Sequence, residues 1–196
     1  MKRNAATRLR AAFFWRRLDQ PGYDSCRLFE LANGWRLVGS AVFCEAQRAC
    51  HFNYTVDADA NFLSRRAAVV GFLGNRAVDL LVRSVGPGRW RIAGASTIVA
   101  GCPDIDLGFT PATNLLPLRR LRLRVGQAAD APAAYLNLPA LELTTLPQRY
   151  LRIARDRYEY ESPTAGYAGT LRVSRAGAVV DYPGIFELVN PKRAGG

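Results

Sequence analysis

Apolar and polar residues alternate with a period of two along much of this chain, and this pattern limits the folds it can adopt. Residues 121–125, Leu-Arg-Leu-Arg-Val, place three aliphatic side chains on one face and two arginines on the other. Successive side chains of a β-strand point to opposite faces, so such a run is typical of a half-buried strand. Runs 26–31 and 35–43 are joined by Asn-Gly at 33–34, a strong hairpin signal. The pattern therefore predicts an antiparallel sheet.

Similar runs continue through the rest of the chain. Gly, Pro, Asn or Asp residues separate most of them, as expected for strands joined by tight turns. No helical segments alternate with the strands, so an antiparallel roll, barrel or sandwich is favoured over βαβ units. The further predicted strands are 51–56, 67–73, 77–85, 89–92, 133–138, 141–146, 150–154, 157–161, 169–173 and 178–182.

One short helix is predicted near the middle of the sequence. Thr110 can cap a helix through its hydroxyl, and Pro111 suits the first helical position because its missing N–H is not needed there. Pro117 cannot lie deep inside a long helix, because it removes a hydrogen bond and clashes with the preceding turn. We therefore predict one or two turns over residues 111–116 and a strand from residue 119 onward.

The charge balance of the 196-residue chain is strongly basic. Lys and Arg number 27 against 16 Asp and Glu, which gives a formal net charge of +11, and Lys2 and Lys192 are the only lysines. Such a surface attracts anions, including phosphates and lipid headgroups. The alternative is a basic outer face without a partner. The sequence has no nucleic-acid-binding motif, so nucleic acid is not an expected partner. No apolar run approaches the roughly 20 residues of a membrane-spanning helix.

The four cysteines, at positions 26, 44, 50 and 102, contain no CxxC pair and match no zinc module. Residues 11–15 are the only apolar run near the basic N-terminus, too short for the roughly 7–15 residues of a signal peptide. We expect free thiols in a cytoplasmic protein, with a Cys44–Cys50 bridge as the alternative. His51 is the only histidine, and no GxSxG motif is present. We therefore predict no metal, no cofactor and no catalytic residue.

Residues 101–121 hold the densest group of candidate functional side chains. Asp104 and Asp106 would point to the same side of a strand, where paired carboxylates can share a proton, bind a cation or perform acid–base chemistry. Alternatively, both pair with Arg119 and Arg120 and anchor the two ends of the short helix. We favour this structural alternative, because two like charges stand near a double arginine.

Tyrosines and arginines recur in the second half of the chain. Tyr158 and Tyr160 share one face of a predicted strand, and Arg149 and Tyr150 precede that strand. Such side chains can bind sugars, bases or headgroups. Tyrosines on the inner face of a curved sheet can equally belong to the core.

The segment 101–121 resembles a glycolipid-binding family of bacterial proteins, whose pattern reads approximately G-C-x-D-x-D-x-x-x-T-P-x-T-N-x-L-P-x-R-R-L. Further similarity at 148–150, 158–161 and 181–186 extends the resemblance over roughly residues 13–188, although Asn-Phe at 61–62 stands near an expected Trp. The resemblance implies a long antiparallel sheet curled as a spiral β-roll around a single helix, and a homodimer. It implies a glycolipid ligand by analogy of shape with lipid carriers, and it implies no catalytic residues.

A curled sheet with one apolar face encloses either a packed core or an acyl-sized cavity. We predict a non-enzymatic protein that binds a glycolipid or another amphiphile within or at the mouth of the roll. Two alternatives stay open: an interaction protein with a packed roll that dimerises through an edge strand, and an enzyme that uses Asp104, Asp106, Arg119 and Tyr150. The candidate ligand-binding residues are Asp104, Asp106, Thr110, Asn114, Arg119, Arg120, Arg149, Tyr150, Tyr158, Tyr160 and Tyr182. The predicted domain spans residues 13–190, between a basic extension (1–12) and a flexible tail (191–196).

Overall fold

The computed structural model describes residues 7–189, which form one sheet of 13 strands and a second sheet of three. The strand order is β7-β6-β5-β4-β3-β2-β1-β16-β15-β14-β13-β12-β9 in the large sheet and β11-β10-β8 in the small one. The strands are β1 (Arg8–Arg17), β2 (Gly22–Leu31), β3 (Gly34–Glu45), β4 (Arg48–Asp59), β5 (Ser64–Leu73), β6 (Arg76–Gly86), β7 (Arg89–Ile92), β8 (Asp104–Asp106), β9 (Ala128–Asp130), β10 (Ala133–Asn137), β11 (Glu142–Leu146), β12 (Arg149–Arg152), β13 (Arg157–Ser162), β14 (Tyr167–Val173), β15 (Val179–Tyr182) and β16 (Phe186–Leu188).

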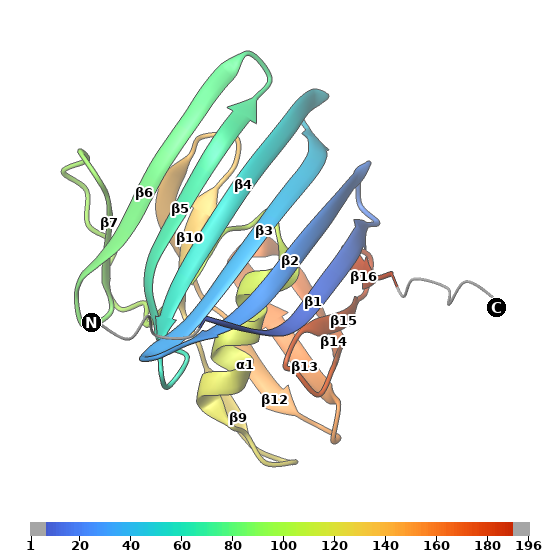
Figure 1. The fold of residues 1–196 in the computed structure, drawn as a ribbon. Helices are drawn as coiled ribbons and strands as arrows, with labels where there is room; N and C mark the ends of the chain where they lie inside the picture. The colour runs from blue at the N-terminus through green and yellow to red at the C-terminus, as the bar shows by residue number, and fades with distance from the viewer. Residues whose placement is uncertain (1–6, 190–196) are drawn as a thin grey trace.

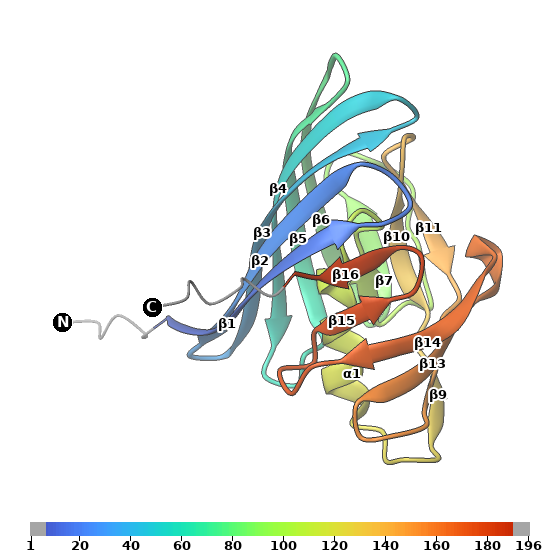
Figure 2. The same cartoon turned by 90° about the vertical axis from the view of Figure 1, so that its right-hand side faces the viewer.

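The large sheet curls around the helical segment and does not close into a barrel. Strands β1 to β6 lie side by side as long neighbours (Figure 1). Figure 2 shows them on one side of helix α1 (Leu115–Leu121), with β10, β11, β13 and β14 on the other side. All neighbours in the large sheet run antiparallel, and the parallel pair β8–β10 lies in the small sheet. The predicted mainly-β class, with one long antiparallel sheet and one short helix, is confirmed.

The helix begins as predicted but extends further. Thr110 Oγ1 accepts a hydrogen bond from the Ala112 N–H at 3.0 Å, and a 3₁₀ turn, η1 (Pro111–Asn114), follows this cap. Helix α1 continues directly from this turn. Pro117 lies in the first turn of α1, where an α-helix leaves N–H groups without intrahelical partners, so the proline is tolerated.

The predicted strand over residues 121–125 is therefore wrong. Leu121 is the last residue of α1, and Arg122 ends the helix in the left-handed conformation with φ +48°. The alternation arose because Leu121 and Leu123 both pack against one cluster of the core while the arginines face outward. Five residues are too few to separate a helix end from a short strand.

The predicted boundary between an N-terminal extension and the domain is also wrong. Strand β1 begins at Arg8, which pairs with Glu30, so residues 8–12 belong to the sheet. They do so because β2 is long enough to pair with them, beyond a bulge between Leu9 and Ala11. The remaining residues 1–6 of the predicted extension and the predicted tail 191–196 lie outside the described residues.

Side chains fill the concave side of the sheet. Leu115 and Leu116 of α1 are fully buried against aromatic and aliphatic residues of the strands. Protein interiors of this kind are close-packed, so the helix and the sheet share one core. The largest fully buried side chains are Trp15, Trp90, Tyr54, Tyr150, Tyr160, Phe52, Phe109, Leu37, Ile105, Leu107, Leu115 and Leu116.

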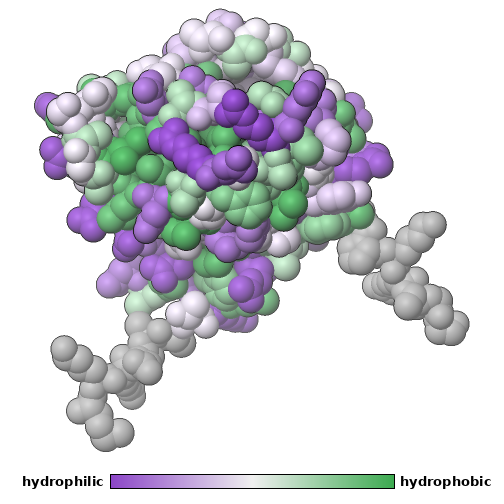
Figure 3. Space-filling model, turned by 90° about the horizontal axis from the view of Figure 1, so that it is seen from above, coloured by the Kyte–Doolittle hydropathy of each residue, from purple (hydrophilic) through white to green (hydrophobic). Residues whose placement is uncertain are grey.

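The outer surface mixes apolar and polar residues. Seen from above, hydrophobic residues lie among hydrophilic ones (Figure 3). Cys26, Cys44, Cys50 and Cys102 are all free thiols, as predicted. No helix in the described part of the chain is long and apolar enough to cross a membrane.

Candidate functional site

The structure does not gather the eleven predicted site residues into one site. Most lie in buried polar groups inside the fold, and Arg119 and Tyr158 line a separate surface pocket. Arg149 is exposed and forms an ion pair with Asp130 at 3.2 Å. The buried groups contain Asp104 with Arg120, Asp106 with Asn114 and Tyr150, Thr110, and Tyr160 with Tyr182.

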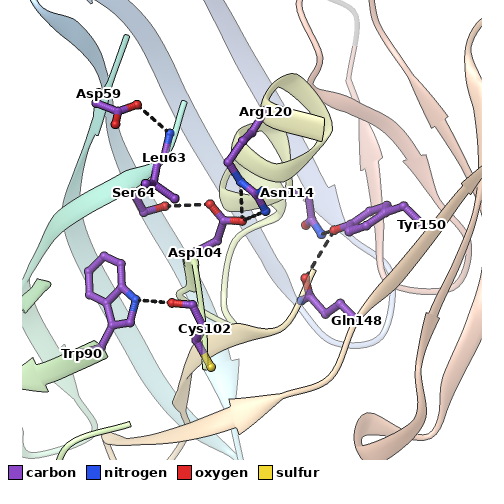
Figure 4. A network of polar contacts seen from close by, with 10 residues as sticks. All are labelled: Asp59, Leu63, Ser64, Trp90, Cys102, Asp104, Asn114, Arg120, Gln148 and Tyr150. Carbon is purple, nitrogen blue, oxygen red and sulfur yellow. Dashed lines mark hydrogen bonds and ion pairs between the residues drawn. The ribbon is translucent and has the colours of Figure 1, made fainter. Parts of the chain in front are cut away.

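A buried ion pair ties β8 to α1. Arg120 Nη2 lies 2.6 Å and Nε 3.1 Å from Asp104 Oδ2, and the side chains are 20% and 1% exposed, respectively (Figure 4). Burial raises the pKa of Asp104, and the guanidinium of Arg120 opposes that shift. This confirms one half of the predicted anchor between the strand before the helix and the helix end.

The other half of the predicted anchor is wrong, because Asp106 pairs with neither Arg119 nor Arg120. Asp106 Oδ1 accepts the Gly108 N–H at 2.8 Å, and Asp106 Oδ2 accepts Gln148 Nε2 at 2.7 Å. Burial raises the pKa of Asp106. The carboxylate is thus satisfied by uncharged donors, and it holds the segment before β12 against β8.

Tyr150 extends this polar chain into an aromatic cluster. Its hydroxyl accepts from Asn114 Nδ2 at 2.9 Å and lies 3.5 Å from Gln148 Oε1 (Figure 4). Its ring centroid lies 4.9 Å from that of Tyr160, which in turn contacts Tyr182 at 5.7 Å. Burial raises the pKa of all three tyrosines. These residues therefore belong to the core and not to the mouth of the roll.

A third buried group contains an acid that sequence reasoning missed. Asp24 is buried and accepts hydrogen bonds from the hydroxyls of Tyr54 at 3.0 Å and Thr110 at 2.5 Å, which are its only side-chain partners in the described chain. Burial raises the pKa of Asp24 to about 7, despite these hydrogen bonds. Thr110 thus joins an acid of β2 to the start of η1. The sequence did not identify Asp24 as a buried acid, because an acidic residue in a strand is expected to face solvent.

A pocket of about 530 Å³, here called the arginine pocket, lies where three turns meet the end of α1. The turns are those between β4 and β5, β12 and β13, and β14 and β15. Within residues 7–189, none of its five arginines forms an ion pair with a carboxylate. The lining consists of Phe62, Leu118, Arg119, Arg122, Arg152, Arg155, Asp156, Tyr158, Val173, Ser174, Arg175 and Gly177.

Arg119 is held in place by packing. Its guanidinium carbon lies 5.0 Å from the ring centroid of Phe62, and the Trp35 ring stacks on Phe62 with a centroid distance of 4.5 Å. A Cβ at Gly177 would lie 2.7 Å from Arg119 Cδ, and Gly177 has φ +93°. Glycine is thus required at position 177, because the backbone has a positive φ and because the aliphatic part of the Arg119 side chain occupies the space of a Cβ.

Arg152 holds the walls of the arginine pocket together. Its Nη1 donates to the Leu123 carbonyl at 2.8 Å and its Nε to the Ala154 carbonyl at 3.2 Å, and Nη2 contacts the Arg155 carbonyl. Its guanidinium also lies over Tyr158 at 5.5 Å. Arg152 is therefore a positioning residue, and the exposed Arg119, Arg122, Arg155 and Arg175 are left to contact a ligand.

Sequence reasoning missed most of this pocket. Four of the lining arginines belong to no recognised sequence motif: Arg122, Arg152, Arg155 and Arg175. Phe62 was noted only because it lies where the family pattern differs from this sequence. The one available signal was the excess of arginine over acidic residues, which does not identify neighbours in space. In the part of the chain that the structure describes, no group of three or more His, Cys, Asp or Glu residues could hold a metal ion.

We expect Asp104→Ala to lower the free energy of unfolding by about 3 kcal/mol, because it leaves the partly buried Arg120 guanidinium without its partner. The double variant Asp104→Ala/Arg120→Ala should lose less than the two single losses added together, as measured by urea denaturation. The exposed Asp130–Arg149 pair is the control, with an expected loss of about 0–1 kcal/mol. Additive losses at Asp104 and Arg120 would contradict the coupling.

Asp24 should make stability depend on pH. Its folded-state pKa of about 7 lies above the ordinary value of 3.8, so between these values only the folded state keeps the proton. The free energy of unfolding should therefore fall as the pH rises through this window, by up to about 4 kcal/mol, and stay low above it. Denaturation curves recorded between these two pH values should show no such fall in the free energy of unfolding for Asp24→Asn. The control Asp130→Asn should show the same fall as the parent protein. Parallel curves for Asp24→Asn and the parent would argue against a protonated Asp24.

The comparisons with known proteins agree with this architecture. The family model described as "Putative glycolipid-binding" matches residues 12–187. A crystal structure of a DUF1089 family protein from Pseudomonas aeruginosa is similar, with 28% sequence identity, coverage of 85% of this chain and 91% of that chain, and a TM-score of 0.73. No curated protein sequence matches the chain. Because the family model spans most of the sequence, the chain belongs to this glycolipid-binding family.

Proposed function

We propose that the protein binds an amphiphile with an anionic headgroup, of the glycolipid class that its family suggests, at the arginine pocket. The observation that carries this proposal is the set of five arginines that line the pocket without a carboxylate ion pair among the described residues. A guanidinium can donate two parallel hydrogen bonds to a phosphate or carboxylate group. Asp156 is the one acidic residue of the lining, so the headgroup would balance the excess of positive charge in the pocket.

The walls of the arginine pocket also suit the apolar part of an amphiphile. Leu118 and Val173 are buried residues whose side chains reach the pocket lining, and the Phe62 and Tyr158 rings stand beside them. Ligand sites commonly combine apolar walls with a few polar groups that fix orientation. The side chains that fill the concave face of the sheet support a site at the surface, with the lipid chain outside the core.

We infer that binding occurs without a chemical reaction. An enzyme would have used Asp104, Asp106 and Tyr150. Asp104 and Tyr150 are buried, Asp106 is partly buried, and all three are hydrogen-bonded to other protein groups. None of the three lines the arginine pocket. This supports a binding role for the protein. The three residues would then contribute to the stability of the fold and not to a reaction.

An interaction protein with a packed roll is the second candidate function. The filled concave face favours it, and strands β7 and β9 are the two edges of the large sheet. A second copy could pair with such an edge, although Trp90 of β7 already pairs with Val99. A homodimer through one of these edges stays a prediction, to be tested by the mass of the protein in solution. A cytoplasmic location is likewise proposed, with support from the four free thiols.

Removing arginines from the pocket should weaken ligand binding while the fold is retained. We expect Arg155→Ala/Arg175→Ala to bind dioctanoyl phosphatidylinositol about a hundredfold more weakly in calorimetry, because two charge-assisted contacts are lost. The control, Arg157→Ala/Arg172→Ala, removes the same charge from two exposed residues outside the pocket and should bind normally. Equal affinities for both variants, or equal binding of uncharged octyl glucoside, would contradict an anion-selective pocket.

A further inference from the structure

Three arginines stand side by side on the exposed face of the sheet, on strands that are neighbours in space. Arg66 of β5 lies directly opposite Arg83 of β6, and Arg83 lies directly opposite Arg91 of β7. All three residues are exposed. Residues directly opposite each other in antiparallel strands have Cα atoms about 4.5–5.5 Å apart. These three residues, here called the arginine row, form a short line of positive charge across the sheet edge shown at the left of Figure 1.

The arginine row lacks carboxylate partners. Asp57 lies opposite Arg66 on β4, but both of its oxygens accept hydrogen bonds from Arg36. No ion pair within the described residues involves any member of the row. Like charges directly opposite each other destabilise a sheet. An anionic partner would offset the repulsion within such a row.

Apolar side chains continue the same face toward the other end of the strands. Val70 and Phe72 follow Arg66 on β5 at even spacing, so they point to the same side, and they are 50% and 41% exposed. Phe72 lies directly opposite His51 of β4, which lies opposite Val42 of β3, and Val42 lies opposite Tyr23 of β2. These three residues are also exposed or partly exposed. The face thus combines a basic line with exposed aliphatic and aromatic groups, and it holds one exposed acid, Asp79, opposite Val70.

We propose that this face docks on an anionic lipid bilayer. Arginines attract anionic headgroups, while exposed aromatic and aliphatic side chains enter the boundary between headgroups and acyl chains. Nucleic acid would use the charge of the arginine row but would leave Val70, Phe72 and Val42 without a function. The proposal goes beyond ligand binding at the arginine pocket, since the two surfaces share no residue.

Vesicle binding tests the proposal directly. Each arginine near an anionic surface contributes roughly a fivefold gain in binding, so Arg66→Ser/Arg83→Ser/Arg91→Ser should bind equimolar phosphatidylcholine–phosphatidylglycerol vesicles on the order of a hundredfold more weakly. The parent protein should not bind vesicles of phosphatidylcholine alone. The matched control, Arg124→Ser/Arg157→Ser/Arg172→Ser, loses the same charge from exposed residues outside both surfaces and should bind vesicles as the parent does.

Two further measurements separate docking from general attraction. Val70→Ser/Phe72→Ser should weaken vesicle binding without altering net charge, and the arginine-row variant should be at least as stable as the parent because repulsion is removed. Equal vesicle binding by the two triple variants would overturn the proposal. So would a loss of binding to a DNA duplex in the arginine-row variant while its vesicle binding is unchanged. The arginine-row variant should still bind dioctanoyl phosphatidylinositol, so this test can fail separately from that of the pocket.

Discussion

The pairing of β1 with β16 is the contact on which the rest of the architecture depends. It joins the meander β1–β7 to strands from the C-terminal half and makes one sheet of 13 strands. Trp15 of β1 strengthens the junction, because its buried ring donates from Nε1 to the Val179 carbonyl of β15 at 2.7 Å. With both halves hydrogen-bonded to each other, the sheet can curl around α1 and place turns from distant parts of the sequence at one end of the helix.

Three acidic side chains point into this fold, whereas many arginines lie on its surface. Asp24, Asp104 and Asp106 are turned inward, and hydroxyls, an amide, a backbone N–H and one guanidinium satisfy them. Many arginines remain outside, and those of the arginine pocket and the arginine row have no carboxylate partner in the described chain. Buried acids with internal partners stabilise the interior, whereas unpaired surface guanidiniums are available to other molecules. The two surfaces that we propose as binding sites are therefore both basic.

Period-two alternation was sufficient to predict most strands, because the alternation of apolar and polar residues within a strand shows which of its faces is buried. Alternation failed at 121–125, where a helix end produced the same pattern. The Asp104–Arg120 pair could be predicted because Asp104 lies on the strand before the short helix and Arg120 lies near the end of that helix. The arginine pocket could not, since Phe62, Arg155 and Arg175 lie in three turns that only the curl of the sheet brings together. A turn has no periodicity that identifies its spatial neighbours.

The position of β16 has a consequence for the order in which the molecule can assemble. During synthesis, β1 to β7 leave the ribosome first and can form a meander of local hairpins, which is a fast kind of folding. The outer edge of β1 then has no partner until the last strand of the sheet is made. An unpaired edge is a template for association with other chains. The nascent chain is therefore most exposed to aggregation in the interval before β16 emerges, and chaperone binding to the edge of β1 would protect it.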